Sequence, residues 1–319
     1  MNRLACAALA LVFAAPAWAG ETEPGDAFGW LQKIANATHK LNYSGTFIYQ
    51  RDKRVETSRI VHRVDETGEQ AKLMTLDGMQ REMYRMNNDV LCFLPDSQTA
   101  VLDKSRAKKM FPAILPEQIS SLKESYNAKL GGRSRVAGRD AQLVVLEPKD
   151  AFRYGHKFWA DTQTGLLLQA AVWKNRQDMV DRFSFSQVSI GQVIDKSEVK
   201  PKLAGRKLIQ NEEGQAKDSE IDPGWQVKSV PPGFKQISAM KRMLPGGQAP
   251  VNHIVFSDGL AAVSVFIETC SEAVETSLSH RGAMNVYTRG VAEHRVKVLG
   301  EVPAATVRQI GDSVSHGGK

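Results

Sequence analysis

The side chains that could do chemistry in this sequence are its seven histidines and three cysteines, and their spacing limits what they can do. No two histidines stand at the i, i+4 or His-x-His spacing that brings imidazoles to one metal ion. The sequence also lacks the Gly-x-Ser-x-Gly elbow of an activated serine, a phosphate-binding glycine loop and a Cys-x-x-Cys redox pair. We therefore expect no enzyme activity, no metal site and no cofactor.

Apolar and aromatic side chains in the first third of the chain could instead line a site for an acyl chain. Five of the nine methionines after Met1 lie between positions 74 and 110. Methionine is flexible and polarizable, so it suits surfaces that accept varied apolar ligands. The candidate cavity residues are Phe47, Tyr49, Met83, Leu91 and Phe93. An ordinary β-sandwich core uses the same residue types, and that alternative stays open.

A basic cluster beside an apolar segment could attract an anion at the rim of such a cavity. The cluster comprises Lys104, Arg106, Lys108 and Lys109, and the apolar segment is 110–115, Met-Phe-Pro-Ala-Ile-Leu. Positive charge attracts an anionic headgroup, and the apolar segment could contact a lipid tail. The sequence thus predicts a site for an anionic amphiphile. The alternative is a basic loop that is merely anchored by its apolar end.

Residues 1–19 are typical of a signal peptide. Arg3 supplies a positive charge, 4–15 is an apolar run, and Ala17 and Ala19 are the small residues that a signal peptidase recognises. The apolar run is shorter than the roughly 18 residues that a membrane span needs. We therefore expect cleavage before Gly20 and a periplasmic protein.

The charge balance indicates what kind of partner the protein binds. The chain has a formal charge of +7, and the loss of Arg3 with the signal peptide lowers it to +6. A basic excess favours acidic partners such as anionic lipid or an acidic peptide, while the expected compartment excludes nucleic acid. A basic surface that serves solubility alone is the alternative that the charge leaves open.

The elements that must position these residues are mostly strands. Asp26 is a predicted N-cap for a helix over 26–41, in which Leu31, Ile34 and Leu41 share one face. The next runs are short, rich in β-branched and aromatic residues, and separated by turn residues, which predicts an antiparallel meander. The predicted strands are 44–50, 55–64, 71–76, 80–86, 90–94, 133–136, 141–147, 152–161, 166–173 and 178–190. A helix predicted over 117–126 interrupts them.

The length and a polar segment predict two domains after the signal peptide, because a single core seldom grows beyond about 300 residues. Residues 195–224 are polar, of mixed charge and poor in aromatic residues, as a linker is. The predicted domains are a β-rich domain over 20–194 and an α+β domain over 225–319. The second domain has predicted strands at 234–243, 252–256, 261–269, 286–289 and 295–301 and a helix that opens at Pro303. Cys92 and Cys270 fall in different domains, so both two separate thiols and an interdomain disulfide stay open.

A series of short motifs runs in order along the whole mature chain. The motifs are 42–49 (Asn-Tyr-Ser-Gly-Thr-Phe-Ile-Tyr), 62–64, 76–78, 80–82, 153–155, 161–166, 182–185, 231–234, 258–268 and 300–303. In this order the chain resembles the periplasmic negative regulators of sigma-E, called RseB in enteric bacteria and MucB in pseudomonads. The segments 104–126 and 195–224 resemble the family less closely.

The resemblance implies both a fold and a function. The implied fold is an unclosed antiparallel β-barrel with packed helices, similar to the lipoprotein carriers LolA and LolB, followed by a smaller α+β domain. The implied function is to bind the periplasmic domain of a membrane anti-sigma factor and shield it from a site-one protease. Lipopolysaccharide or mislocalised lipid would release it.

The sequence leaves open two other functions, the residues that contact a partner, and the oligomeric state. One alternative is a periplasmic lipid or lipoprotein carrier, and the other is a hydrolase without a recognisable motif. Neither the residues that contact the anti-sigma peptide nor the formation of a homodimer can be deduced from the sequence.

Overall fold

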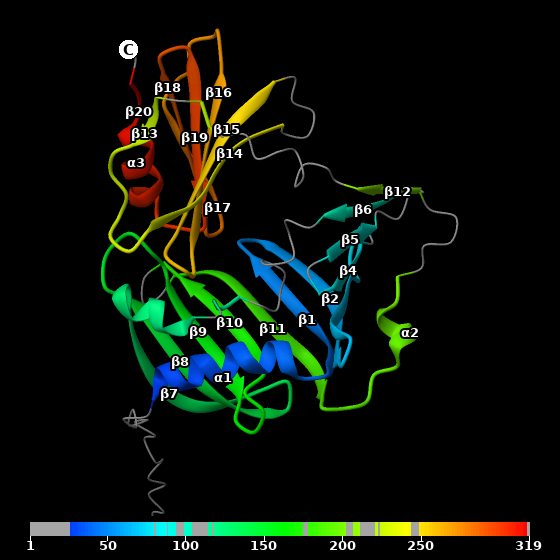
Figure 1. Ribbon diagram of the computed structural model, residues 1–319. Coiled ribbons are helices and arrows are strands. Elements are labelled where there is room, and N and C mark those ends of the chain that lie inside the picture. The colour runs from blue at the N-terminus through cyan, green and yellow to red at the C-terminus, as the bar shows by residue number, and fades with distance from the viewer. Residues whose placement is uncertain are drawn as a thin grey trace, which may run out of the picture.

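The computed structural model shows two main β-sheets, each with its own core, and a separate two-stranded sheet (Figure 1). It describes residues 26–79, 81–87, 89–93, 99–103, 114–116, 118–174, 178–201, 207–210, 221–222, 224–243 and 249–317. The predicted signal peptide and the basic cluster of Lys104, Arg106, Lys108 and Lys109 lie outside these residues.

The larger sheet is open and almost entirely antiparallel. Its strands are β1 (Tyr43–Arg51), β2 (Arg54–Asp65), β3 (Gly68–Thr75), β4 (Glu82–Met86), β5 (Asp89–Phe93), β6 (Thr99–Asp103), β7 (Tyr126–Val136), β8 (Arg139–Pro148), β9 (Gly155–Asp161), β10 (Leu167–Trp173), β11 (Met179–Ile190) and β12 (Lys207–Gln210). Their order is β12-β6-β5-β4-β3-β2-β1-β11-β10-β9-β8-β7, so β12 and β7 are two separate edges. β12 pairs in parallel with β6, and the other pairs are antiparallel. The predicted mainly-β fold with an unclosed antiparallel sheet is confirmed.

Helix α1 (Ala27–Lys40) crosses the concave face of this sheet and packs on β7, β8 and β10 (Figure 1). Its predicted N-cap is confirmed, because the Asp26 carboxylate accepts a hydrogen bond from the Gly29 N–H at 2.8 Å. Leu31 and Ile34 are fully buried in the core that the helix forms with the sheet. The core therefore fills the part of the concave face that lies under α1.

The segment before β7 corrects one prediction. The helix predicted over 117–126 is wrong for the described residues 118–126: the 3₁₀ helix η2 spans Ile119–Glu124, and Tyr126 already begins β7. The Tyr126 ring is buried at the start of this strand. Burial of this aromatic side chain favours an extended backbone at a point where local periodicity favours a helix.

The segment predicted to be a linker carries secondary structure of its own. Asp195 caps the short helix α2 (Lys196–Val199), whose Val199 is buried against Val61 of β2. Strand β12 follows and extends the sheet at the β6 edge.

The smaller sheet belongs to the C-terminal part of the chain. It contains β14 (Lys235–Met243), β15 (Pro250–Ser257), β16 (Ala262–Thr269), β17 (Ser277–Arg281), β18 (Met284–Val291) and β19 (His294–Gly300), in the order β14-β15-β16-β19-β18-β17. Helix α3 (Ala304–Ser313) packs on β18 and β19, and β13 (Trp225–Val227) pairs with β20 (Val314–His316) beside it. No helix in the described part of the chain has the length and hydropathy to cross a membrane.

Below, the large unit means the larger sheet with α1, η2 and α2, and the small unit means the smaller sheet with α3, β13 and β20. Cys92 lies in the large unit and Cys270 in the small one, and no disulfide joins them.

Candidate functional site

A cavity of about 380 Å³ opens on the concave face of the large unit, beyond the part that α1 covers. Ligand sites in proteins typically measure about 300–1,000 Å³, so this cavity has room for one slender ligand. Its wall is mainly apolar. The apolar lining includes Phe47, Leu73, Ile114, Phe158, Ala170 and Phe183. Such a wall suits a hydrocarbon chain.

The strands explain why these side chains meet. Phe47 of β1 pairs with Phe185 of β11, and Tyr49 pairs with Phe183, so alternate residues of the two strands face the cavity side together. The Phe47 ring meets the Phe183 ring edge to face, with centroids 5.0 Å apart. These contacts form the floor of the cavity.

One end of the cavity is polar and is organised around Arg51, the last residue of β1. Its Nε donates to Asp181 Oδ2 at 3.2 Å, and its terminal nitrogen donates to Tyr49 Oη at 2.6 Å and to Glu301 Oε1 at 2.7 Å. Tyr49 Oη in turn donates to Asp181 Oδ2 at 3.2 Å. Tyr49, Asp181 and Glu301 all line the cavity. We call this set of four residues the Arg51 cluster.

The two carboxylates of the Arg51 cluster differ in burial. The Asp181 side chain is only 5% exposed, and its Oδ1 is buried without a hydrogen-bond partner among the described residues. Burial, and then the charge of Glu301, raises the pKa of Asp181, although Arg51 and Tyr49 act against the shift. The Glu301 side chain is 48% exposed, and ion pairs between exposed groups contribute about 1 kcal/mol or less. Asp181 is therefore fixed in the cluster, while Glu301 is weakly held.

The small unit closes this end of the cavity. Leu260 and Glu301, which line it, come from the loops after β15 and β19. The turn between β17 and β18 packs on the Arg51 cluster: the Gly282 N–H donates to Asp52 Oδ2 at 2.6 Å, and a Cβ at Gly282 would lie 2.7 Å from Asp181 Oδ1. Gly282 also has a φ of +58°, which favours glycine. The site is thus assembled from both units.

A buried ion pair joins the two units beside the cavity. Arg153, in the loop before β9, donates from Nη1 to Asp258 Oδ2 at 2.9 Å, and both side chains are fully buried. Tyr126 Oη donates to the same oxygen at 3.3 Å, and Arg153 also donates to the Pro232 carbonyl. The guanidinium lies over the Phe234 ring at 5.1 Å. Residues 152–154, which the sequence assigned to a strand, therefore form an interface loop.

The structure separates the predicted cavity residues into groups. Phe47 and Tyr49 line the cavity. Leu91 and Phe93 pack with Tyr84 and Ala100 in a second cluster, and Met83 packs near Val90 in a third. Lipid contact by any of the five stays a prediction.

Sequence reasoning missed the polar end of the cavity. Arg51 could have been found, because it continues the two-residue spacing of Phe47 and Tyr49 along β1. Glu301 could not, because it comes from the other unit and is 250 residues away in the chain.

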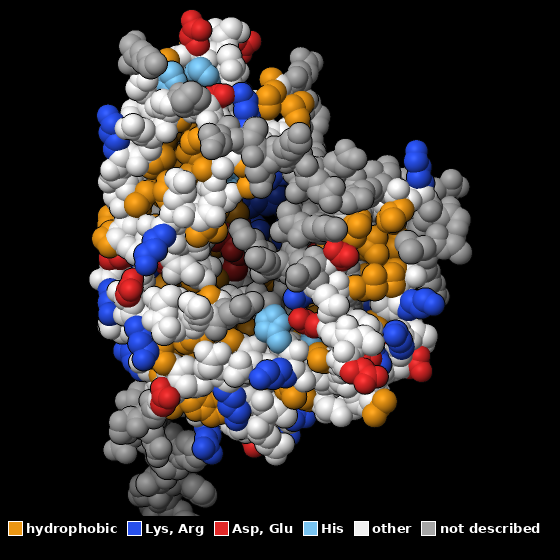
Figure 2. Space-filling model, in the orientation of Figure 1, with side chains coloured by type: hydrophobic (Ala, Val, Ile, Leu, Met, Phe, Trp, Pro, Cys, Tyr) orange, Lys and Arg blue, Asp and Glu red, His pale blue; other side chains and the backbone are white. Residues whose placement is uncertain are grey.

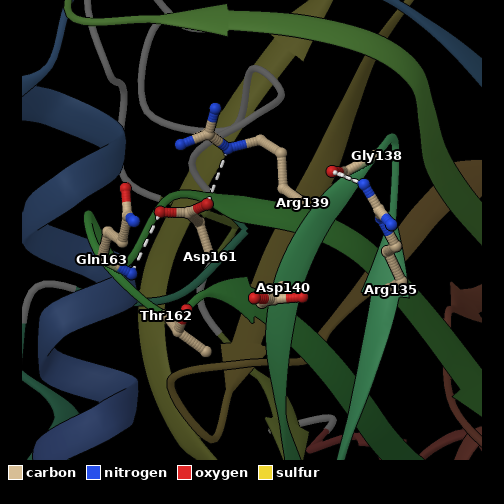
Figure 3. A pocket seen from close by; sticks show the side chains of 7 residues that line it. All are labelled: Arg135, Gly138, Arg139, Asp140, Asp161, Thr162 and Gln163. Carbon is tan, nitrogen blue, oxygen red and sulfur yellow. Dashed lines mark hydrogen bonds and ion pairs between the residues drawn. The ribbon is translucent and has the colours of Figure 1, made fainter.

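A second pocket is polar and lies at the turns β7–β8 and β9–β10, with a volume of about 320 Å³ (Figure 3). Arg139 Nε donates to Asp161 Oδ2 at 2.6 Å. Burial alone would raise the pKa of Asp161, but hydrogen bonds from Arg139 and Thr164 outweigh it and lower that pKa. Arg135 donates to the Gly138 carbonyl at 3.0 Å. The lining holds two arginines and two aspartates, so its charges balance and give no preference for an anion.

The molecular surface and the arrangement of possible metal ligands are the remaining features of the site region. Figure 2 shows a surface that is hollowed where the small unit meets the large one. Within the described ranges, no group of three His, Cys, Asp or Glu side chains is arranged to hold a metal ion.

Comparison with known proteins identifies relatives across the chain. Residues 26–203 match the MucB/RseB N-terminal domain and residues 219–315 match the MucB/RseB C-terminal domain. The sigma factor AlgU regulatory protein MucB of Pseudomonas aeruginosa is 31% identical over 302 residues, which is 92% of each chain. The sigma-E factor regulatory protein RseB of Escherichia coli is 24% identical over 289 residues, which is 90% of each chain.

Solved structures show the same architecture. MucB in the complex of Pseudomonas aeruginosa MucA and MucB matches with a TM-score of 0.76 and 28% identity, over 92% of this chain and all of that one. A crystal structure of MucB matches with a TM-score of 0.63 and 26% identity, over 92% of this chain and 98% of that one.

Proposed function

Because the chain belongs to the MucB/RseB family, we propose that it is a periplasmic negative regulator of a sigma-E-type envelope stress response. It binds the periplasmic domain of a membrane anti-sigma factor and protects that domain from site-one proteolysis. Lipopolysaccharide or mislocalised lipid releases it. The signal peptide at 1–19, the domains at 20–194 and 225–319, and a linker at 195–224 that adds α2 and β12 to the large unit are part of this proposal.

The observation that carries the proposal is the match of both family domains, in order, to one chain. The named relatives are sigma-factor regulatory proteins and not enzymes, which confirms the expectation drawn from the missing catalytic motifs. The MucB relative has been solved together with MucA, and one such structure contains the periplasmic part of MucA. A homologous chain with the same two units is expected to bind a homologous partner.

The cavity supports the second half of the proposal, the response to lipid. An amphiphile that fills the cavity must meet Leu260 and Glu301 of the small unit. If the anti-sigma peptide needs the two units in their present arrangement, lipid and peptide each weaken the binding of the other by the same factor. A coupling of this kind is typically worth about 1–3 kcal/mol.

The experiment is a protection assay with the mature full-length protein. The periplasmic segment of the anti-sigma factor from the same organism is incubated with its site-one protease, with and without the protein. We expect the protein to slow cleavage by at least tenfold at saturation, and a soluble lipid A analogue to restore most of the rate.

Two controls make the result specific. A substrate of the protease that is unrelated to the anti-sigma factor should be cleaved at the same rate with and without the protein. If the protein neither binds the periplasmic segment nor slows its cleavage, the proposed function is wrong, and lipid transfer between vesicles becomes the activity to measure.

A further inference from the structure

We propose that Glu301 occupies the site of an anionic headgroup, so that an amphiphile in the cavity and the small unit compete for Arg51. This inference rests on the proposed function, because it assumes that the cavity beside Arg51 takes an amphiphile. It adds the site of the headgroup, the chemical class of the ligand and the contact that the ligand breaks.

The position of Arg51 is the first argument. Its guanidinium binds three residues that line the cavity, Tyr49, Asp181 and Glu301, and therefore lies beside a polar part of a wall that is mainly apolar. Arginine presents several donors in a planar fork that fits carboxylate and phosphate oxygens. A ligand with its tail against Phe47 and Phe183 would thus have its charged end beside Arg51.

The difference between the two carboxylates is the second argument. Asp181 is enclosed by β1 and β11 of the large unit and by the Gly282 turn of the small unit, so no ligand can replace it without separating these elements. Glu301 is about half exposed and bonds only one terminal nitrogen of Arg51 in the described structure. It can return to water at low cost, so a phosphate or carboxylate on a ligand can take its place.

The size of the cavity is the third argument and restricts the ligand. A volume of about 380 Å³ lies near the lower end of the usual range for ligand sites. The site in this form suits one acyl chain with one anionic group. A lipid with many chains would have to place a single chain there.

Displacement of Glu301 would loosen the small unit only where it meets the Arg51 cluster. Glu301 and the Gly282 turn hold the small unit at the Arg51 cluster, whereas Arg153 and Asp258 hold it through a fully buried pair. Loss of the contacts at Glu301 and Gly282 leaves the Arg153–Asp258 pair in place, and the small unit can pivot about it. The ligand therefore tilts the small unit and does not detach it.

Binding of dodecyl phosphate, below its micelle concentration, tests the competition by calorimetry on the mature full-length protein. Glu301→Gln removes the competing charge and should tighten binding about two- to fivefold, as loss of a half-exposed ion pair allows. Arg51→Gln should weaken it at least tenfold. Glu268→Gln is the matched control, since it removes a carboxylate that is 32% exposed and pairs with Arg295 elsewhere in the small unit, and binding should not change.

The ligands supply a second set of controls. Dodecyl maltoside has the same tail and no charge, so Glu301→Gln and Arg51→Gln should leave its affinity unchanged. Inorganic phosphate alone should bind at least a hundredfold more weakly than dodecyl phosphate, because it lacks the tail. If dodecyl phosphate binds but neither Glu301→Gln nor Arg51→Gln alters its affinity, the headgroup site is wrong and the lipid-responsive cavity stands.

If the proposed response to lipid is itself wrong, the binding measurements give a different result. If neither dodecyl phosphate nor dodecyl maltoside binds, the cavity takes no amphiphile and both proposals are wrong about lipid. Hydrogen exchange tests the tilt: saturation with dodecyl phosphate should speed exchange at the Gly282 N–H, which donates to Asp52. Unchanged exchange with ligand bound would overturn the tilt.

Discussion

His156 of β9 is a titratable side chain in the cavity wall, and its surroundings determine its charge. Its ring stacks on Phe158 with centroids 5.9 Å apart and meets Tyr126 edge on at 6.1 Å. Burial lowers the pKa of His156 from 6.5 to about 4. The folded protein therefore keeps this imidazole neutral at a pH where the unfolded chain protonates it.

The replacement His156→Phe tests whether the buried, neutral imidazole makes the stability of the protein depend on pH. In the wild type, the folded pKa lies below the unfolded one, so stability is full above about pH 6.5 and is lost as the pH falls towards 4. Phenylalanine keeps the aromatic contacts and has no proton to bind. We expect the free energy of unfolding of the variant to fall less between pH 6.5 and 4, measured by urea denaturation at several pH values. Equal pH dependence in the two proteins would contradict the assignment.

At the scale of elements, a polar cluster around Glu69 fastens the end of α1 to the sheet. Glu69 of β3 contacts His39 of α1 at 3.2 Å, His62 of β2 at 3.0 Å and Arg85 of β4 at 3.2 Å. His62 is buried with Nδ1 2.8 Å from the Leu41 carbonyl, so both of its nitrogens face acceptors. One carboxylate thus links a helix to three neighbouring strands.

Replacement of Glu69 by Gln should destabilise the fold by about 1–3 kcal/mol at neutral pH, because it leaves buried polar groups poorly paired. Burial acts to raise the pKa of Glu69, but hydrogen bonds from His39 and His62 and the charge of Arg85 outweigh it and lower the pKa from 4.5 to about 2. The stability that the carboxylate contributes is therefore present above pH 4.5 and lost as the pH falls towards 2.

The measurement is chemical denaturation of the wild type and Glu69→Gln from pH 7 down to pH 3. The difference between them should shrink below pH 4.5. Glu147→Gln is the control, since it removes an exposed partner of Lys129 and should cost less than about 1 kcal/mol. A difference that stays constant down to pH 3 would show that Glu69 does not act through its charge.

The elements also show how far the sequence predicts the structure. Alternation and turn residues predicted β1, β2 and β11 nearly to their ends, and in β1 and β11 the alternation reflects one buried face. Strands β6, β12, β13, β17 and β20 were missed; all five residues of β17 are exposed, so it has no burial pattern to read. The cavity was predicted only through β1. Its other walls depend on which strands become neighbours, and that is decided by contacts far apart in the chain.

At the scale of the whole molecule, the Arg153–Asp258 pair should make the two units unfold together. Removal of one partner of a buried ion pair leaves the other charge without compensation and costs about 3–5 kcal/mol. Asp258 also accepts hydrogen bonds from the Leu260 and Ala261 N–H groups of its own turn, and asparagine can keep that oxygen. Asp258→Asn therefore acts chiefly on the interface.

Scanning calorimetry of the full-length protein tests whether the two units unfold together. We expect one transition for the wild type and two separated transitions for Asp258→Asn, the first at a lower temperature. Glu268→Gln, which removes a partly exposed ion pair inside the small unit, should keep a single transition. A single transition for Asp258→Asn at the wild-type temperature would contradict the coupling.

Strand β12 sets a limit on how far the small unit can travel. Because residues 207–210 are bonded to β6, the chain is anchored there, and only the stretch from Gln210 to Ile221 is left to reach the small unit. Eleven peptide steps span at most about 40 Å when fully extended. The connection between the two units is therefore short, and it starts at the β12 edge of the large sheet. A shift in the pairing of β12 with β6 would change the length of this connection.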